Sequence, residues 1–179
     1  QEAIDPLSSA IKMVKGKHGK YRYTYLLAQL NEITGNTSRA ISLYQDVVKL
    51  NPPYDVEFNA RINIAGVFDV ASGNPEEIRR ELDKMLKDTK NKDFLDQIYY
   101  VLGTLSMKEG KEEEALQYFR KSALAPSRNP NQKGRSYLAL AEYFYNKPDF
   151  LKAGKYYDST VFFLDEKYPD YQKLKTKSL

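Results

Sequence analysis

A spacing of 37 or 38 residues recurs along this chain, and it constrains the fold more than any other feature of the sequence. Small residues mark this interval in two parallel series, Ala28, Gly66, Gly103 and Ala141 in one and Gly35, Gly73 and Gly110 in the other. Self-similarity at a period of about 20–50 residues is typical of arrays in which each unit packs against its neighbours. The sequence therefore predicts a linear stack of similar helical units.

The clearest unit spans residues 96–126 and has the pattern of two helices joined by a turn. Its landmarks are an aromatic residue, a Leu-Gly pair, a turn glycine, an Ala-x-x-x-Phe pair and a closing proline, at Tyr99, Leu102, Gly103, Gly110, Ala115, Phe119 and Pro126. Gly103 allows the two helices to approach closely, Ala115 is small where the second helix crosses the first, and Phe119 fills the space one turn further on. Gly110 can adopt the left-handed conformation that ends a helix.

Three further units repeat these landmarks in the same order. They are Leu27, Ala28, Gly35, Ala40, Tyr44 and Pro52; then Ile62, Ala65, Gly66, Gly73, Ile78 and Leu82; then Tyr137, Leu140, Ala141, Ala153 and Tyr157. The last unit lacks the turn glycine, and Asn146 is expected to take the left-handed position there, followed by Pro148. The pattern resembles the tetratricopeptide repeat. The expected fold class is therefore all-α, an α-α superhelix or tetratricopeptide solenoid of about four and a half repeats.

We expect a single array over residues 1–179. It consists of a partial repeat 1–20, repeats 21–58, 59–95, 96–133 and 134–169, and a C-terminal helix 170–179. The expected helices are 6–17, 21–34, 37–50, 57–72, 75–89, 93–109, 112–125, 132–146, 149–166 and 170–178, with Asp5 as the cap of the first. The interval exceeds the usual repeat of about 34 residues, and the extra residues are expected in longer second helices or in longer connectors.

Composition and motifs argue against an enzyme. The chain has no cysteine, which excludes disulfides and thiolate metal sites. The single histidine, His18, has no other metal-binding residue near it in the sequence, and we expect it in a solvated connector with no metal and no cofactor. No glycine-rich phosphate loop and no set of nucleophile, base and oxyanion donors can be assembled, so no catalytic residue is expected. No apolar run approaches the roughly 18 residues of a membrane span.

A basic stretch precedes and enters the first complete repeat. It contains Lys12, Lys15, Lys17, Lys20 and Arg22 without any acidic residue. Such a stretch could face anionic lipid or a nucleic acid, or it could be a solvated helix end at which lysine favours the helix dipole. The net charge of +4 is spread along the whole chain, so no nucleic-acid partner is expected.

Several segments resemble a narrower family. These are Tyr21 to Leu30, Val48 to Ala65 with its Asn-Pro-Pro-Tyr and Phe-Asn-Ala-Arg motifs, Tyr156 to Thr160, and Tyr168 to Tyr171. They are similar to the N-terminal repeat region of the tetratricopeptide-repeat lipoproteins of Bacteroidetes gliding motility and type IX secretion. The resemblance implies a periplasm-facing scaffold of a secretion or motility machine, anchored in the outer membrane. Membrane contact is then expected only through a lipid anchor outside this sequence.

The expected partner is a protein or peptide segment on the concave face formed by the first helix of each repeat. The residues selected for this groove lie on the side of those helices away from the core: Tyr25, Gln29, Asn63, Val67, Tyr100, Thr104, Leu138 and Glu142, with Arg135 at the edge of the groove. Tyr25 and Tyr100 are the expected exposed anchors. Tyr25 and Gln29 stand where chaperone-binding tetratricopeptide domains have Lys and Asn, so a terminal carboxylate ligand is not expected. The alternatives are a general peptide-binding or envelope-assembly adaptor, and an enzyme whose catalytic part lies outside these repeats.

Overall fold

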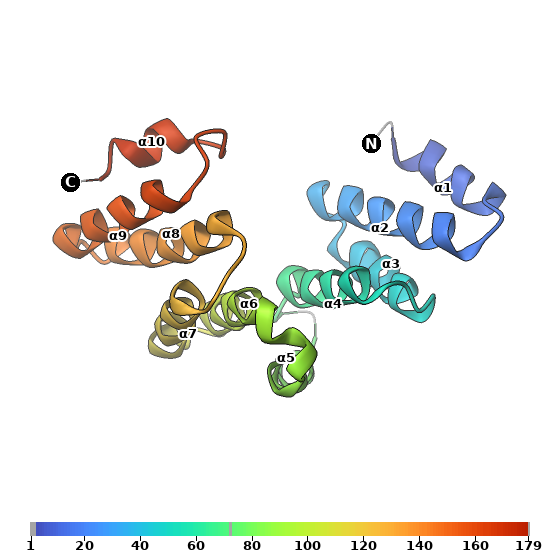
Figure 1. The fold of residues 1–179 in the computed structure, drawn as a ribbon, viewed down its shortest axis with the longest axis horizontal. Helices are drawn as coiled ribbons and strands as arrows, with labels where there is room; N and C mark the ends of the chain where they lie inside the picture. Colours follow the sequence, from blue (N-terminus) through green and yellow to red (C-terminus); the bar gives the residue numbers. More distant parts are fainter. Residues whose placement is uncertain (1–2, 72, 179) are drawn as a thin grey trace. The chain divides into compact units, whose positions relative to one another are not determined.

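The computed structural model describes residues 3–71 and 73–178, and the regular structure within them is entirely helical, as predicted (Figure 1). The elements are α1 (Ile4–Met13), α2 (Lys17–Ile33), α3 (Thr37–Lys49), α4 (Tyr54–Val67), α5 (Pro75–Lys87), the 3₁₀ helix η1 (Thr89–Phe94), α6 (Leu95–Lys108), α7 (Glu112–Leu124), α8 (Pro130–Asn146), α9 (Phe150–Phe163) and α10 (Tyr171–Lys175). They form two compact units, unit 1 from Gln1 to Asn74 and unit 2 from Pro75 to Leu179. Each unit is described by itself.

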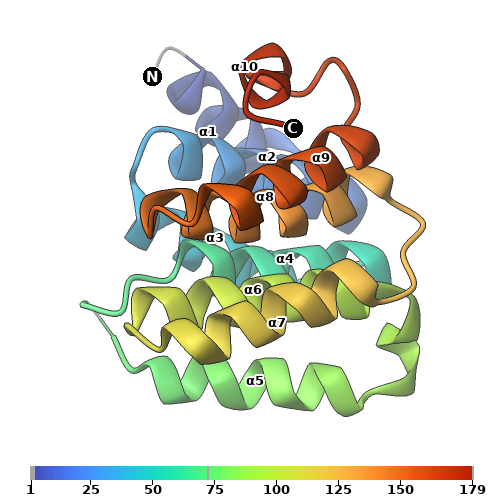
Figure 2. The same ribbon diagram turned by 90° about the vertical axis from the view of Figure 1, so that its left-hand side faces the viewer.

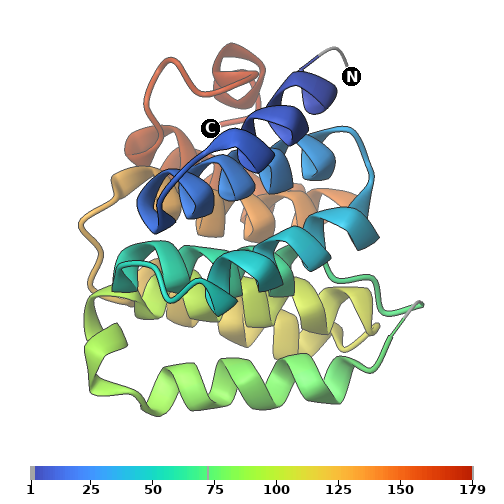
Figure 3. The ribbon, with the colours of Figure 1, turned by 90° about the vertical axis from the view of Figure 1, so that its right-hand side faces the viewer.

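Unit 1 stacks α1, α2, α3 and α4 in chain order, each helix against the next (Figure 3). Its core lies between α2 and α3, where Ala28, Ala40, Tyr44 and Val47 are completely buried. The Tyr44 hydroxyl, at the edge of this core, donates a hydrogen bond of 2.7 Å to Glu32. The partly buried side chains of α1 pack against this cluster, so α1 continues the stack as a neighbouring helix, and its assignment to a preceding repeat stays a prediction.

Unit 2 contains two tightly packed helix pairs, α6 with α7 and α8 with α9, and α7 also packs against α8 (Figure 2). Leu102, Ala115 and Phe119 are buried in the first pair, and Ala153 and Tyr157 in the second. The short helix α10 lies against α9 and buries Leu174 there. The landmark residues thus occupy the core positions that the sequence predicts.

Glycine ends the first helix of two repeats in the left-handed conformation. Gly35 has φ of 79° and Gly110 has φ of 75°, a region that costs a residue with a Cβ about 1 kcal/mol or more. The expectation for the last repeat was wrong, because Asn146 is the final residue of α8 and remains helical. The turn is made instead by Asp149, whose side chain accepts a hydrogen bond from the Lys152 backbone N–H and caps α9.

The close contact between α6 and α7 depends on Gly103. A Cβ built on this residue would lie 2.7 Å from the Phe119 ring, so the ring rests directly on the glycine backbone. Gly66, at the matching position of α4, has open space where its Cβ would be. The same landmark therefore has different packing in the two units.

Several expected helix boundaries were wrong, each for a local reason. The first helix begins at Ile4, not Pro6, with Asp5 inside its first turn; Pro6 is tolerated because backbone N–H groups there have no intrahelical acceptor. The second begins at Lys17, which makes His18 helical and not part of a connector. The helix expected over 57–72 begins at Tyr54 and ends at Val67, because the backbone becomes extended at Phe68, whose ring is buried. Ser72, the last residue of that expected helix, lies outside the described residues. Leu179, at the end of the C-terminal helix expected over 170–179, also lies outside them.

The longer repeat interval arises in the connectors and not in the second helices. The second helices α3, α5 and α7 each have 13 residues and α9 has 14. The segment between α5 and α6 is occupied by η1, whose Asn91 is buried and donates a side-chain hydrogen bond to the Met85 carbonyl oxygen. The two helices expected in the repeat 59–95 fall in different units, and the single array over 1–179 stays a prediction.

Alanine substitutions at Gly103 and Gly66 should have opposite effects on stability. Gly103→Ala should lower the free energy of unfolding by about 1–2 kcal/mol, because the new methyl group collides with the Phe119 ring. Gly66→Ala should raise it by about 0.5–1 kcal/mol, because alanine is the better helix former and nothing lies in its way. Denaturant unfolding followed by circular dichroism measures both, and equal effects would contradict the register assigned to the repeats.

Candidate partner-binding surfaces

The predicted groove residues divide between the two units. Tyr25 and Gln29 lie on α2, and Asn63 and Val67 lie on α4, in unit 1. The members in unit 2 are Tyr100 and Thr104 on α6, and Arg135, Leu138 and Glu142 on α8. All of them are on first helices, as predicted. Their role in binding stays a prediction.

In unit 2, Tyr100 and Arg135 are in direct contact across α6 and α8. The guanidinium carbon of Arg135 lies 4.8 Å from the centroid of the Tyr100 ring, within the range of a cation–π interaction. The other side of Tyr100 packs against Phe119, with ring centroids 5.6 Å apart. Arg135 itself is exposed, so it presents a positive group whose position is fixed by an aromatic ring.

Beside this pair, α6, α7 and α8 enclose a surface hollow of about 420 Å³. Thr104 and Glu142 line it from α6 and α8, together with Met107, Phe119 and Tyr143. Glu142 is exposed, while the Thr104 hydroxyl donates a 3.1 Å hydrogen bond to the Tyr100 carbonyl oxygen. The hollow therefore combines an apolar floor with a free carboxylate at its rim.

A charged cluster closes the opposite end of the hollow. Glu112 accepts hydrogen bonds from the Tyr143 hydroxyl at 2.8 Å and is paired with the Lys147 ammonium at 3.0 Å. The hydrogen bond from Tyr143 and the one from Lys147 hold the pKa of Glu112 below its usual range. The same bonds to Glu112 raise the pKa values of Tyr143 and Lys147. These groups fix the start of α7 against the end of α8.

In unit 1, the matching surface is organised by Tyr25 and Asn63. The Asn63 amide donates a 2.9 Å hydrogen bond to the Tyr25 hydroxyl, which joins α4 to α2. Burial raises the pKa of Tyr25, and the hydrogen bond from Asn63 offsets part of that rise. A smaller hollow of about 230 Å³ opens beside Tyr25, with Leu26 and Val56 in its lining.

Two expectations about the groove were wrong in detail. Tyr25 and Tyr100 are half-buried, not exposed anchors, because the Tyr25 ring packs edge-on against Tyr44 at 5.4 Å and Tyr100 lies between Phe119 and Arg135. Leu138 is half-buried and packs against the core between α8 and α9. Gln29 and Val67 are half-buried on their helices.

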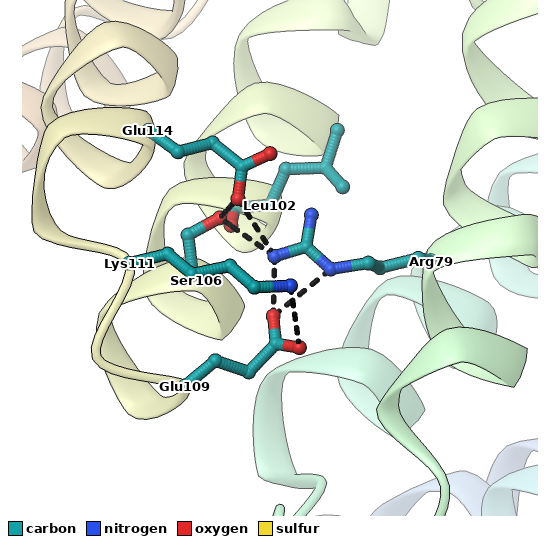
Figure 4. A network of polar contacts seen from close by, with 6 residues as sticks. All are labelled: Arg79, Leu102, Ser106, Glu109, Lys111 and Glu114. Atoms are coloured by element: carbon teal, nitrogen blue, oxygen red, sulfur yellow. Dashed lines mark hydrogen bonds and ion pairs between the residues drawn. The ribbon is translucent and has the colours of Figure 1, made fainter.

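The sequence did not reveal an ion network that joins α5 to α6 and α7 (Figure 4). Arg79 of α5 donates from Nε to Glu109 at 2.9 Å and from Nη2 to Glu114 at 2.9 Å and to Ser106 at 3.0 Å. Lys111 adds a second cation, 3.1 Å from Glu109. The side chain of Arg79 is 11% exposed and that of Glu109 only 8%, so these charges are stabilised by one another and not by water.

Burial and pairing act in opposite directions on this network. Burial alone raises the pKa of Glu109, but the hydrogen bonds and positive charges of Arg79 and Lys111 outweigh it and hold that pKa below its usual value. Burial lowers the pKa of Arg79, and the two carboxylates raise it above the ordinary value. The network therefore requires Glu109 in its ionised form. Its partners are about 30 residues apart and follow no repeat phase, which is why the sequence pattern does not predict it.

His18 has a structural contact that accounts for its position. Its Nδ1 lies 2.7 Å from the Tyr21 hydroxyl, and its Nε2 lies 3.3 Å from Arg22, all within the first turns of α2. In the part of the chain that the structure describes, no three histidine or acidic side chains come together as a metal site would need. None of the described helices is long and apolar enough to cross a membrane.

The tetratricopeptide-repeat family matches residues 21–54 and 96–125. The chain contains tetratricopeptide repeats. The matched segments are the helix pairs α2–α3 and α6–α7, the repeats in which Gly35 and Gly110 make the left-handed turn. With the successive packed helices, this confirms the all-α tetratricopeptide solenoid as the fold class. No curated protein matches the sequence.

Tetratricopeptide repeats generally bind other proteins and serve as scaffolds, and proteins built from them are typically not enzymes. The first-helix surfaces of the two units are therefore candidate partner-binding surfaces. They are shaped by aromatic contacts and by charged groups of both signs.

Replacing Arg79 should make the stability of unit 2 depend less on acid pH. Arg79→Met should lower the free energy of unfolding at neutral pH by about 2–3 kcal/mol, since it leaves Glu109 and Glu114 short of a partner. A carboxylate with a lowered pKa stabilises the fold above its ordinary value of 4.5, and that stability is lost as the pH falls through the lower folded value. The difference between wild type and variant should therefore shrink below about pH 4.5.

Denaturant titrations at a series of pH values measure this difference. The matched control is Arg80→Met, because Arg80 is the next residue on α5 and is exposed. An equal loss of stability in both variants, or a difference that stays constant down to acid pH, would contradict the role given to the network.

Proposed function

We propose that this chain is a protein-binding scaffold whose partner lies along the first helices, with the α6–α8 surface of unit 2 as the main contact. The observation that carries the proposal is the hollow of about 420 Å³ beside the Tyr100–Arg135 pair. An apolar side chain of a partner fits the floor of this hollow. Arg135 and Glu142, both exposed, supply opposite charges that orient it.

The chemistry of this surface favours a peptide segment over a metabolite. The hollow is open to solvent and is bounded by side chains from successive helices, as expected of a repeat stack. Its lining mixes apolar atoms with Lys108, Glu142 and Lys147. Such a mixture suits a segment that carries an apolar anchor between groups of opposite charge.

The narrower assignment rests on the resemblance of residues 48–65 and neighbouring segments to the gliding-motility and type IX secretion lipoproteins. On that basis the chain belongs to the periplasmic side of the outer membrane, as part of a secretion or motility machine, with a lipid anchor outside these residues. A general peptide-binding or envelope-assembly adaptor is the alternative, because the same first-helix surface would serve it. A full-length gene that encodes a cysteine for lipid attachment would favour the first assignment. A full-length gene that encodes a catalytic domain would contradict both.

Substitutions on the α6–α8 surface should weaken partner capture from the native cell envelope. Arg135→Ala and Glu142→Lys should each reduce the amount of partner recovered roughly tenfold, the effect of an interface residue worth about 1.4 kcal/mol. Arg120→Ala and Glu113→Lys are the matched controls, since both residues are exposed on the second helix α7. Quantitative mass spectrometry of the captured proteins measures the ratio.

The pair of variants that loses the partner indicates which surface binds it. Loss of the partner with the α7 controls alone would move the binding surface to the second helices. Retention of the partner by all four variants would place the docking site outside the α6–α8 surface. Circular dichroism of each variant verifies that the fold is intact.

A further inference from the structure

Unit 1 contains a second surface hollow, of about 430 Å³, bounded by α1, α2 and α3. It is distinct from the first-helix surfaces described above, and its charged lining is almost entirely basic: Lys12, Lys20, Arg39 and Lys49, with Asp46 as the one acidic residue. Asp46 is paired with Lys49 at 3.0 Å. Among the described residues, no carboxylate lies at ion-pair distance from Lys12, Lys20 or Arg39, so three positive charges facing the hollow are uncompensated.

The positions of two of these cations are unfavourable for the helices that carry them. Lys20 lies in the first turn of α2 and Arg39 in the first turn of α3, and neither turn contains an acidic residue. Positive charge near a helix N-terminus opposes the helix dipole and is mildly destabilising. The first turns of α4, α5, α6 and α7 contain acidic residues, whereas those of α8 and α9 contain none and carry Lys133 and Lys152. The helix dipole therefore gives Lys20 and Arg39 no stabilisation at these positions.

The floor of the hollow is apolar and elongated. Leu43 of α3 and Leu50, which follows the end of α3, line it, with Ile11 and Leu27 from the neighbouring helices. Along α3 and just past its end, the lining residues run from Arg39 to Leu50, which corresponds to about 16 Å at a helical rise of 1.5 Å per residue. A site of this length fits an extended or helical stretch of several residues better than one small anion.

We propose that this basic hollow binds an acidic segment of a partner protein, with an apolar side chain on the leucine floor and flanking carboxylates at Lys12, Lys20 and Arg39. The positive charges of the hollow favour a negatively charged segment, and the apolar floor can hold an apolar side chain that lies between the acidic groups of that segment. A flat bilayer surface reaches the cations at the rim and leaves the floor empty, so the concave shape favours a peptide over a membrane. Within the basic stretch of the sequence, Lys12 and Lys20 line the hollow and would contact the acidic segment. Lys15 and Lys17 do not line it.

This inference goes beyond the proposed function, because it concerns unit 1 and residues that the α6–α8 surface does not use. The two proposals can fail independently. Variants of Arg39 test the basic hollow, and variants of Arg135 test the α6–α8 surface.

The test uses a fluorescein-labelled peptide in which leucines alternate with pairs of glutamates, and a second peptide in which glutamines replace the glutamates. Fluorescence anisotropy should show binding of the acidic peptide to the full chain, weaker binding as the salt concentration rises, and little binding of the glutamine peptide. Arg39→Glu and the double variant Lys12→Glu with Lys20→Glu should each weaken binding of the acidic peptide by about tenfold or more. Lys15→Glu is the matched control and should leave the affinity within about twofold of wild type, because its side chain is exposed outside the hollow.

Each other result would overturn the proposal in a recognisable way. An equal loss of affinity with Lys15→Glu would indicate a diffuse basic surface and no defined site. Equal binding of the glutamine peptide would show that the charge of the peptide does not contribute to its affinity. Sedimentation with vesicles of phosphatidylglycerol that is lost in Arg39→Glu, without peptide binding, would assign the hollow to anionic lipid.

Discussion

The helix pairs α2–α3 and α6–α7 depend on a large ring of the second helix buried beside a small residue of the first. Phe119 rests on Gly103 so closely that no Cβ fits between them, and Tyr44 and Ala28 are completely buried at the matching positions of unit 1. A buried phenol in this position needs a partner for its hydroxyl, and Glu32 of the first helix accepts that bond. Burial and this hydrogen bond raise the pKa of Tyr44 far above its usual value, as expected of a buried phenol that donates a hydrogen bond to a carboxylate.

Because this contact is made by side-chain size at fixed positions, the sequence alone predicted the helices, most of the core and the pairing of α2 with α3, α6 with α7 and α8 with α9. The pairing expected within the repeat 59–95 stays a prediction. Features that depend on other interactions were missed. The early end of α4 follows from burial of the Phe68 ring, and the structure places Asn146 inside α8 although asparagine is a good left-handed residue. The Arg79 network joins side chains that no repeat phase brings together, so only the folded chain reveals it.

The candidate surfaces were predictable only to the level of the helix face. A spacing of four residues selected Tyr100 and Thr104 for the groove, Arg135 was expected at its edge, and the structure shows the contact between Tyr100 and Arg135. Exposure could not be predicted the same way, because it depends on the neighbouring helix. Tyr25 is half-buried since Asn63 reaches its hydroxyl across the stack, and Tyr100 is covered by Arg135. The aromatic residues therefore position the polar groups, and the polar groups are the ones available to a partner.

Lysine and arginine side chains have different roles in the two units. In unit 2, Arg79 and Lys147 are paired with carboxylates, so their charges hold helices together and contribute little to the field outside. In unit 1, no described carboxylate pairs with Lys12, Lys20 or Arg39 around the basic hollow, and their field extends into solvent over a screening length of about 10 Å at 0.1 M salt. A partner of unit 2 is then selected by the shape of a hollow with balanced charge, whereas a partner of the basic hollow is attracted by its sign before contact. Binding at the basic hollow should accordingly be the more sensitive of the two to ionic strength.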